Sequence, residues 1–346
     1  MRRNKLIRTL SPVICLLISF VLVAFILLAS GYSPLTAYEA MFSNALGSKS
    51  GIIQTLLKTT LLIFCGLSAA TALRANVFNI GIEGQLYMGA FASFLVGRYL
   101  TGLPCMIHIP LCMLAGALVG AAYAFIPAIL KQKAGAHEVV TTIMLNYVAT
   151  LLTAYFTNHT FKAEGMMPQT ELIQESARIS RIVSQGQLTW AIVIAIVFLL
   201  IAQFYLYHTP RGYEIECVGS NAKAAEAGGI SVTRIQMLTM LLSGAIAGIG
   251  GTMEVLGTHG RFIEGFASGA GYQGVSIAIL GGSSPLGVGL SSFLFGALQY
   301  GGSAMSRTTG IPAEFAEVIQ AVVVLCVSAP LLVQVLFPER RRQRYE

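Results

Sequence analysis

Several carboxylate and amide side chains lie within stretches of sequence that are otherwise apolar. Asn79, Glu83 and Gln85 fall in the run FNIGIEGQL. If this run starts a helix, Asn79 and Glu83 lie one turn apart on the same face. A carboxylate in an apolar segment is costly unless it faces the interior of a bundle, so these residues are candidates for lining the path of a polar substrate. The alternative is that they fix an irregular helix start through hydrogen bonds.

A second polar pattern follows in the next part of the chain. Polar residues recur there at every fourth position, namely Glu138, Thr142, Asn146 and Thr150. This spacing puts them in one stripe on an apolar helix. The stripe either lines a pathway or bonds neighbouring helices, a contact worth only about 0.6 to 2 kcal/mol. We take Asn146 as the pathway candidate of this stripe, and the candidate set is completed by Glu254 and Gln273.

Motifs for catalysis are missing from the sequence. A phosphate-binding loop needs a Gly-Lys pair, and the chain has none. His137-Glu138 begins like a zinc protease motif, but Thr141 stands where the second histidine ligand is required. We therefore expect no catalytic residues, no metal site and no cofactor bound by this chain. Any work driven by ATP would need the ATPase of a partner.

The composition excludes a soluble globular protein. The chain is 55% hydrophobic and only 11% charged, and its mean hydropathy is +0.72. Several apolar runs approach or exceed the roughly 20 residues that cross a bilayer core. The net charge of +7 does not indicate nucleic-acid binding, because the Lys and Arg residues lie in loops and near the termini. The predicted spans are 12–29, 52–73, 80–96, 109–130, 139–157, 188–206, 235–256, 272–280, 286–304 and 315–336.

The Lys and Arg residues also orient these spans, since cytoplasmic loops carry an excess of them. Placing the N-terminus inside puts the larger share of these cations in cytoplasmic segments. The prediction is an all-α polytopic membrane protein of about ten transmembrane helices, with both the N- and C-termini cytoplasmic. Its single domain, 1–346, divides into a first span 11–30, a repeat-like half 52–157, an outer loop 158–187, a cytoplasmic loop 207–234, a second repeat-like half 235–336 and a basic cytoplasmic tail 337–346.

The two predicted halves share one feature. The second span of each half is short and flanked by glycine, at 79–96 and at 271–282. Paired short segments in matching halves indicate a substrate path near the membrane midplane, and the alternative is a chance similarity. Two G-x-x-x-G motifs, at Gly116/Gly120 and Gly244/Gly248, predict close packing between helices.

The loop 207–234 carries a predicted short helix. Gly219-Ser220-Asn221 can stop and recap the chain, Ala222 to Ala227 favours a helix, and Gly228-Gly229 can end it. This segment is either an ordinary connector or a docking helix for a partner. Because little of the loop is apolar, we expect the bundle not to hold it, so that a bulky charge at Ala225 would leave folding intact.

Five motifs occur in an order that resembles a known family. They are FNIGIEGQ, HEVVTTIMLNYVA, the G-x-N-x-x-A-A-x-x-x-G-I pattern, SGAIAGIGGTMEVLGT and GYQGVSIAILGG. Together they are similar to the inner-membrane permeases of ATP-binding-cassette (ABC) importers of the branched-chain amino acid and ribose class. The first two motifs are most similar to the nucleoside and simple-sugar branch. The resemblance covers about Ile52 to Leu336.

The resemblance implies a permease subunit, located in a bacterial plasma membrane, that works with a cytoplasmic ATPase, a second permease and an extracytoplasmic substrate-binding lipoprotein. It further implies that the G-x-N-x-x-A-A loop is the helix that couples to the ATPase, through Gly219, Asn221, Ala224, Ala225, Gly229 and Ile230. Relatives often have Tyr and then Ala before the final Gly-Ile, where this chain has Ala227 and Gly228. A simple-sugar or branched-chain amino acid permease is one alternative. Another is a proton-coupled secondary transporter that uses Glu83 or Glu254 as its proton carrier.

Overall fold

The computed structural model describes residues 17–183, 186–312 and 314–328. The predicted cytoplasmic tail, both termini and the start of the first span lie outside these ranges. Within them the ordered elements are helices and three isolated β-bridges. The chain forms two compact units, one of Met1–Gly51 with Ala297–Glu346 and the other of Ile52–Gly296.

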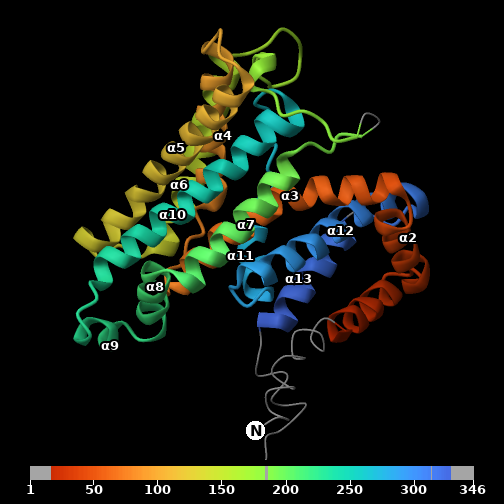
Figure 1. Ribbon diagram of the computed structural model, residues 1–346. Coiled ribbons are helices and arrows are strands. Elements are labelled where there is room, and N and C mark those ends of the chain that lie inside the picture. Colours follow the sequence, from red (N-terminus) through yellow and green to blue (C-terminus); the bar gives the residue numbers. More distant parts are fainter. Residues whose placement is uncertain (1–16, 184–185, 313, 329–346) are drawn as a thin grey trace, which may run out of the picture. The chain divides into compact units, whose positions relative to one another are not determined.

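The helices follow one another along the chain, with one long connection between α6 and α7, and Figure 1 labels most of them. After an apolar helix Leu17–Ala29, they are α2 (Pro34–Leu46), α3 (Lys49–Arg74), α4 (Ile82–Tyr99), α5 (Cys105–Ala134), α6 (Glu138–His159), the 3₁₀ turn η1 (Glu175–Ala177), α7 (Ala191–His208), α8 (Pro210–Ser220), α9 (Ala222–Ala227), α10 (Val232–Met253), the π-helical η2 (Glu254–His259), α11 (Ala270–Leu280), α12 (Pro285–Thr309) and α13 (Glu314–Ser328).

Within the described residues, each predicted span overlaps one of these helices, and the end of the last span, 329–336, lies outside the described residues. In the described part of the chain, five helices are long and apolar enough to cross a membrane, namely Lys49–Arg74, Cys105–Ala134, Glu138–His159, Ala191–His208 and Val232–His259. The helices Leu17–Ala29 and Ala270–Leu280 are apolar but shorter. This pattern is that of a polytopic membrane protein, and the full set of ten crossings stays a prediction. The sequence analysis did not anticipate α2 or α8.

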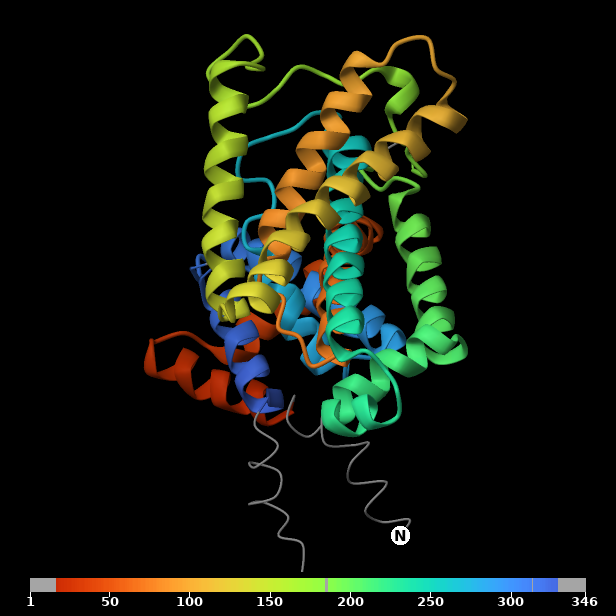
Figure 2. The same ribbon diagram turned by 90° about the vertical axis from the view of Figure 1, so that its left-hand side faces the viewer.

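Glycines bring three helices of the second unit into direct backbone contact. Helices α4, α5 and α10 lie side by side in both views (Figures 1 and 2). A Cβ on Gly248 of α10 would lie 2.1 Å from the carbonyl oxygen of Gly116 on α5, and one on Gly120 would lie 2.3 Å from that of Gly244. A Cβ on Gly89 of α4 would meet Gly248 Cα at 2.4 Å. The two predicted G-x-x-x-G motifs therefore pack against each other, and α4 joins them through Gly89.

The first unit is held by contacts among its own helices. The hydroxyl of Tyr38 on α2 donates to the carbonyl oxygen of Phe20 at 2.7 Å. The last part of α12 packs closely on α13, because a Cβ on Gly302 would lie 2.0 Å from the Ala316 Cβ.

The segment between α6 and α7 contains the predicted outer loop. Its described residues contain a single 3₁₀ turn, η1. Backbone bonds tie it to α4 and η2 of the same unit, from Gln174 N to Gly97 O at 2.8 Å and from Ile179 N to Leu256 O at 2.9 Å. An ion pair between Arg98 and Glu171 adds a side-chain contact.

Candidate functional site

The first turn of α4 is the centre of a buried polar network. Its Glu83 side chain is 6% exposed. One carboxylate oxygen, Oε1, accepts from Gly269 N at 3.1 Å, and Oε2 accepts from Gly271 N at 2.7 Å. Gly269 is the N-cap of α11, so the carboxylate satisfies N–H groups that a helix start leaves without partners. A negative group is also favoured at the positive end of the helix dipole.

The amide of Asn79 forms the second part of the network. Its Nδ2 donates to Gln85 Oε1 and to Ser243 Oγ, both at 2.8 Å. Its Oδ1 accepts from Gln85 Nε2 and from Gly81 N, both at 3.0 Å. An amide has two donor hydrogens and two acceptor lone pairs, so these bonds use its whole capacity. Because α4 begins only at Ile82, the prediction that Asn79 and Glu83 share a helix face is wrong.

Ser243 extends this network from α10 to α3. Its hydroxyl donates to the Ser68 carbonyl oxygen at 2.8 Å, and the Ser68 hydroxyl donates back to the Ser243 carbonyl oxygen at 2.7 Å. Both serines are completely buried. Neither serine was among the predicted site residues. Ser243 lies within the SGAIAGIGG run, but no polar pattern marks Ser68.

Asn146 on α6 contributes a third set of bonds. Its Nδ2 donates to Ile80 O at 2.8 Å and to the hydroxyl of Tyr272 at 3.1 Å. Its Oδ1 accepts from Gly84 N at 2.8 Å. Asn146 therefore ties α6 to the start of α4 and to α11. The hydroxyls of Thr142 and Thr150 bond carbonyl oxygens of their own helix.

Glu138 links the start of α6 to the end of α5 and to the chain that precedes α4. Glu138 at the start of α6 forms an ion pair with Lys131 near the end of α5. Its Oε1 accepts from Phe78 N at 2.9 Å. Glu138 thus acts on the chain that leads into α4.

The structure brings four of the six candidate pathway residues together, namely Asn79, Glu83, Gln85 and Asn146. Among the bonds described for residues 17–328, none joins Glu254 to this group. Its carboxylate lies 3.4 Å from His259 Nε2 within the η2 turn. Gln273 lies on α11, where its N–H donates to Gly269 O at 3.2 Å. In this conformation the polar atoms of the network hold α3, α4, α6, α10 and α11 in place.

The predicted cytoplasmic loop forms a pair of short helices. Thr209 caps α8 by accepting from Gly212 N at 3.2 Å, and Pro210 occupies the first turn. Thr-Pro before a helix is a recognised start signal, which the sequence analysis overlooked. Asn221 then caps α9 by accepting from Ala224 N at 3.1 Å, as predicted.

The end of α9 also follows the prediction. Gly229 has a φ of +84°, a backbone conformation that glycine adopts without steric cost. Its N–H donates to Glu226 O at 2.9 Å, and Ile230 N donates to Ala225 O at 3.0 Å. These two bonds are those of a Schellman motif, which is commonly accompanied by an apolar contact across the helix end. Ile230 supplies that contact, since it packs against the same cluster as Ala225.

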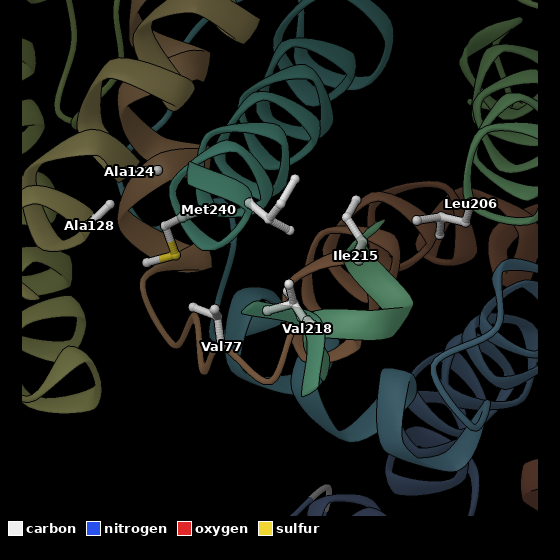
Figure 3. Packing of buried hydrophobic residues seen from close by; sticks show 10 residues of the cluster. Val77, Ala124, Ala128, Leu206, Ile215, Val218 and Met240 are labelled. Atoms are coloured by element: carbon white, nitrogen blue, oxygen red, sulfur yellow. The ribbon is translucent and has the colours of Figure 1, made fainter. Parts of the chain in front are cut away.

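Ala225 is buried, which corrects the expectation that the bundle does not hold this loop. Ala225 is only 5% exposed. It belongs to an apolar cluster with Ala75, Val77, Ala124, Ala128, Leu206, Ile215, Val218, Ile235 and Met240. Figure 3 shows Ile215 and Val218 of this cluster between Leu206 on one side and Val77 and Met240 on the other. We call these ten residues the seat cluster, because they seat α8 and α9 on the bundle.

Gly219 brings the two helices against the end of α3. A Cβ at this position would lie 1.9 Å from the carbonyl oxygen of Arg74, so only glycine fits without a backbone shift. The guanidinium of Arg74 lies 4.2 Å from the ring centroid of Tyr207 on α7. The face of α9 turned away from the seat is exposed and consists of Lys223, Ala224, Glu226 and Ala227.

This architecture can be compared with known proteins. A family described as branched-chain amino acid transport system / permease component matches residues 51–328. The chain belongs to this family. The match covers every helix of the buried network and the α8–α9 pair. A permease of this family is a multi-pass membrane component of a transport system rather than an enzyme.

Curated relatives of this permease cover almost its whole length. It is 35% identical to the nucleoside ABC transporter permease protein NupB of Lactococcus lactis subsp. cremoris, over 98% of this chain and 95% of the relative. It is 33% identical to the guanosine ABC transporter permease protein NupP of Bacillus subtilis, over 98% and 99%. It is also 33% identical to the glucose ABC transporter permease protein TsgB13 of Haloferax volcanii, over 91% and 86%. No solved structure gives a significant match.

Proposed function

We propose that this chain is the permease subunit of an ABC importer for nucleosides, located in a bacterial plasma membrane. The observation that carries the proposal is the similarity over nearly the full length to permeases named for nucleosides and guanosine. The geometry of α8 and α9 supports the coupling part of the proposal. A capped helix with one face seated on the bundle and the other exposed is suited to docking on a second protein.

The proposed complex contains three further components. A cytoplasmic ATPase binds the exposed face of α9 and supplies the energy of ATP hydrolysis. A second permease completes the transmembrane pathway, and an extracytoplasmic lipoprotein delivers the substrate. Glu83 and its hydrogen-bonded neighbours would border the pathway as the fixed wall at which α4 and α11 meet.

A sugar is the second candidate substrate, because a permease named for glucose is 33% identical over 91% of this chain. Branched-chain amino acids stay a third possibility through the family description. The bonds of Glu83 argue against a proton carrier at that position. A carboxylate that accepts from two backbone N–H groups is fixed in place.

Uptake of labelled substrates tests the proposal. A strain lacking this gene, with and without a plasmid copy, is supplied with guanosine, glucose, ribose and leucine, and the purified permease is tested for a co-purifying ATPase. We expect restored guanosine uptake and recovery of an ATPase. Restored sugar or leucine uptake would reassign the substrate. Uptake that needs no ATPase and is abolished by a protonophore would replace the importer with a secondary transporter.

A further inference from the structure

The seven residues between α3 and α4 have their two ends in different environments. We call Ala75–Gly81 the connector. Ala75 and Val77 belong to the seat cluster, beneath α8 and α9. Asn79 and Ile80 take part in the polar network around the first turn of α4.

The first residues of the connector, Ala75 to Val77, are its lower end. They are fixed to α3 by a second Schellman motif. Val77 N donates to Ala72 O at 3.1 Å, and Asn76 N donates to Leu73 O at 3.0 Å. Asn76 has a φ of +54°, the left-handed conformation that this motif requires and that asparagine tolerates better than most residues. The turn directs Val77, which is 3% exposed, into the seat cluster. Gly219 of α8 packs on the Arg74 carbonyl directly before this turn.

The remaining residues, Phe78 to Gly81, are the upper end of the connector. Each of them takes part in a hydrogen bond. Phe78 N donates to Glu138 Oε1 at 2.9 Å, and Ile80 O accepts from Asn146 Nδ2 at 2.8 Å. Gly81 N donates to the Asn79 side chain at 3.0 Å. The Asn79 side chain in turn reaches Ser243 on α10.

We propose that the connector transmits movement between the α8–α9 pair and the polar network, so that Val77 and Asn79 are positioning residues for energy coupling. This inference rests on the proposed function. Val77 and Asn79 are two positions apart, and two residues span at most about 7 Å. Because both residues are held by packing or hydrogen bonds, the connector has no slack to absorb a shift of its lower end.

The proposal gives a route by which movement of α9 would reach α4, α10 and α11. A force on α9 reaches the connector through Ala225 and Val218 of the seat cluster and through Gly219 on the end of α3. The connector passes it to Asn79, and from there to Gln85 on α4 and Ser243 on α10. Asn146 and Glu83 extend the same network to α11. The proposal therefore assigns the docking helix a short physical route to the helices that border the pathway.

The experiment uses the complete importer reconstituted in liposomes, with guanosine as the substrate. ATP hydrolysis and guanosine uptake are measured together, and their ratio reports coupling. Val77→Ala shortens the side chain that joins the connector to the seat cluster. We expect it to retain the ATPase but raise the ATP hydrolysed per guanosine by roughly twofold or more, the smallest change typical for substitutions along a coupling route. Val77→Ile keeps the contact and should restore the wild-type ratio.

A matched substitution separates coupling from stability. Val323 on α13 is fully buried and lies in the other compact unit, so Val323→Ala makes the same cavity elsewhere and should leave the ratio unchanged. Asn79→Ala tests the upper end independently, including the case in which Val77→Ala does not accumulate. Residues on one route are not additive, so the double variant should raise the ratio no further than the stronger single variant.

The possible outcomes are distinct. The connector proposal is overturned if Val77→Ala and Asn79→Ala both give the ratio of Val323→Ala. It is also overturned if their effects multiply in the double variant. By contrast, a wild-type complex in which guanosine neither enters nor stimulates ATP hydrolysis would contradict the proposed function itself.

Discussion

Two adjacent alanines on α9 should respond in opposite ways to the same substitution. Ala225 is 5% exposed and packs in the seat cluster, whereas Ala224 is exposed. Ala225→Glu places an unpaired carboxylate among apolar side chains, which costs about 3–5 kcal/mol. Proteins are typically stable by only roughly 5–15 kcal/mol. The permease therefore loses a large part of its stability, or α9 leaves its seat to reach water.

Ala224→Glu should leave the fold intact. A substitution at an exposed position outside the core usually changes stability by no more than about 0.5 kcal/mol, and this one keeps the backbone bond from Ala224 N to the Asn221 side chain. The new carboxylate lies on the face that we propose contacts the ATPase, where its burial without a partner would weaken docking. We expect wild-type amounts of protein in the membrane, an unchanged melting temperature and little or no recovered ATPase.

The assay compares membrane level, melting temperature in detergent and recovery of the ATPase for both variants. Ala134→Glu is the control, because Ala134 is exposed at the end of α5 and receives the same charge without touching α9. It should match wild type in all three measurements. The reasoning is refuted if Ala225→Glu keeps both the wild-type melting temperature and the ATPase, since a charge in the seat cluster would then cost nothing.

Three further predictions concern packing, the polar network and topology. Gly248→Ala should lower stability by about 1–3 kcal/mol, because its Cβ would lie 2.1 Å from the Gly116 carbonyl oxygen. The loss is measured as a fall in melting temperature. An unchanged melting temperature would contradict the close packing of α5 on α10. Glu83→Gln should lower the melting temperature by removing an acceptor from one buried N–H at the start of α11, a loss of about 1–3 kcal/mol; lost uptake at unchanged stability would instead favour contact with the substrate. In a cysteine-free background, Met166→Cys should react with a membrane-impermeant thiol reagent in intact cells and Ser220→Cys should not; reversed labelling would invert the orientation.

Local patterns were sufficient to predict much of the helical architecture. Apolar runs located the spans because a helix that crosses a membrane must be apolar over most of its length. The caps of α9 were predictable because Asn221 and Gly229 act within a few residues of their own position. The G-x-x-x-G motifs indicated close packing, but which helices they join depends on the tertiary fold. The facing of Gly116 and Gly248 was therefore visible only in the structure.

The bonds of the polar network could not be predicted from the sequence, because they also depend on the tertiary fold. Its members were recognised as costly in an apolar segment, but their partners come from distant parts of the chain. Glu83 bonds Gly269 and Gly271 through their backbone N–H groups, which no side-chain pattern reveals. The assumption that the helix began at Asn79 was also wrong, because its side chain bonds Gly81 N and holds the chain outside the helix. Asn and Asp often compete with helix hydrogen bonds in this way.

The structure places most residues of the loop motif against the bundle or at the ends of α9. Of its six residues, Gly219, Ala225 and Ile230 pack against the bundle, and Asn221 and Gly229 shape the ends of α9. These five residues hold α9 on the bundle and shape its ends. Ala224 alone of the six is left for a docking protein.

Partner choice should therefore depend on positions outside the shared motif. Lys223, Glu226 and Ala227 are exposed on α9, and the exposed Gly228 follows them, where a Cβ would lie 3.3 Å from the Ala225 carbonyl oxygen. Ala227 and Gly228 are the two positions at which the resemblance noted from the sequence leads us to expect Tyr and then Ala. Gly228 has a φ of −81°, so its backbone does not require glycine. The pair consequently alters the exposed surface of α9 and leaves the seat cluster intact, so under the proposed docking it would affect the fit to the ATPase.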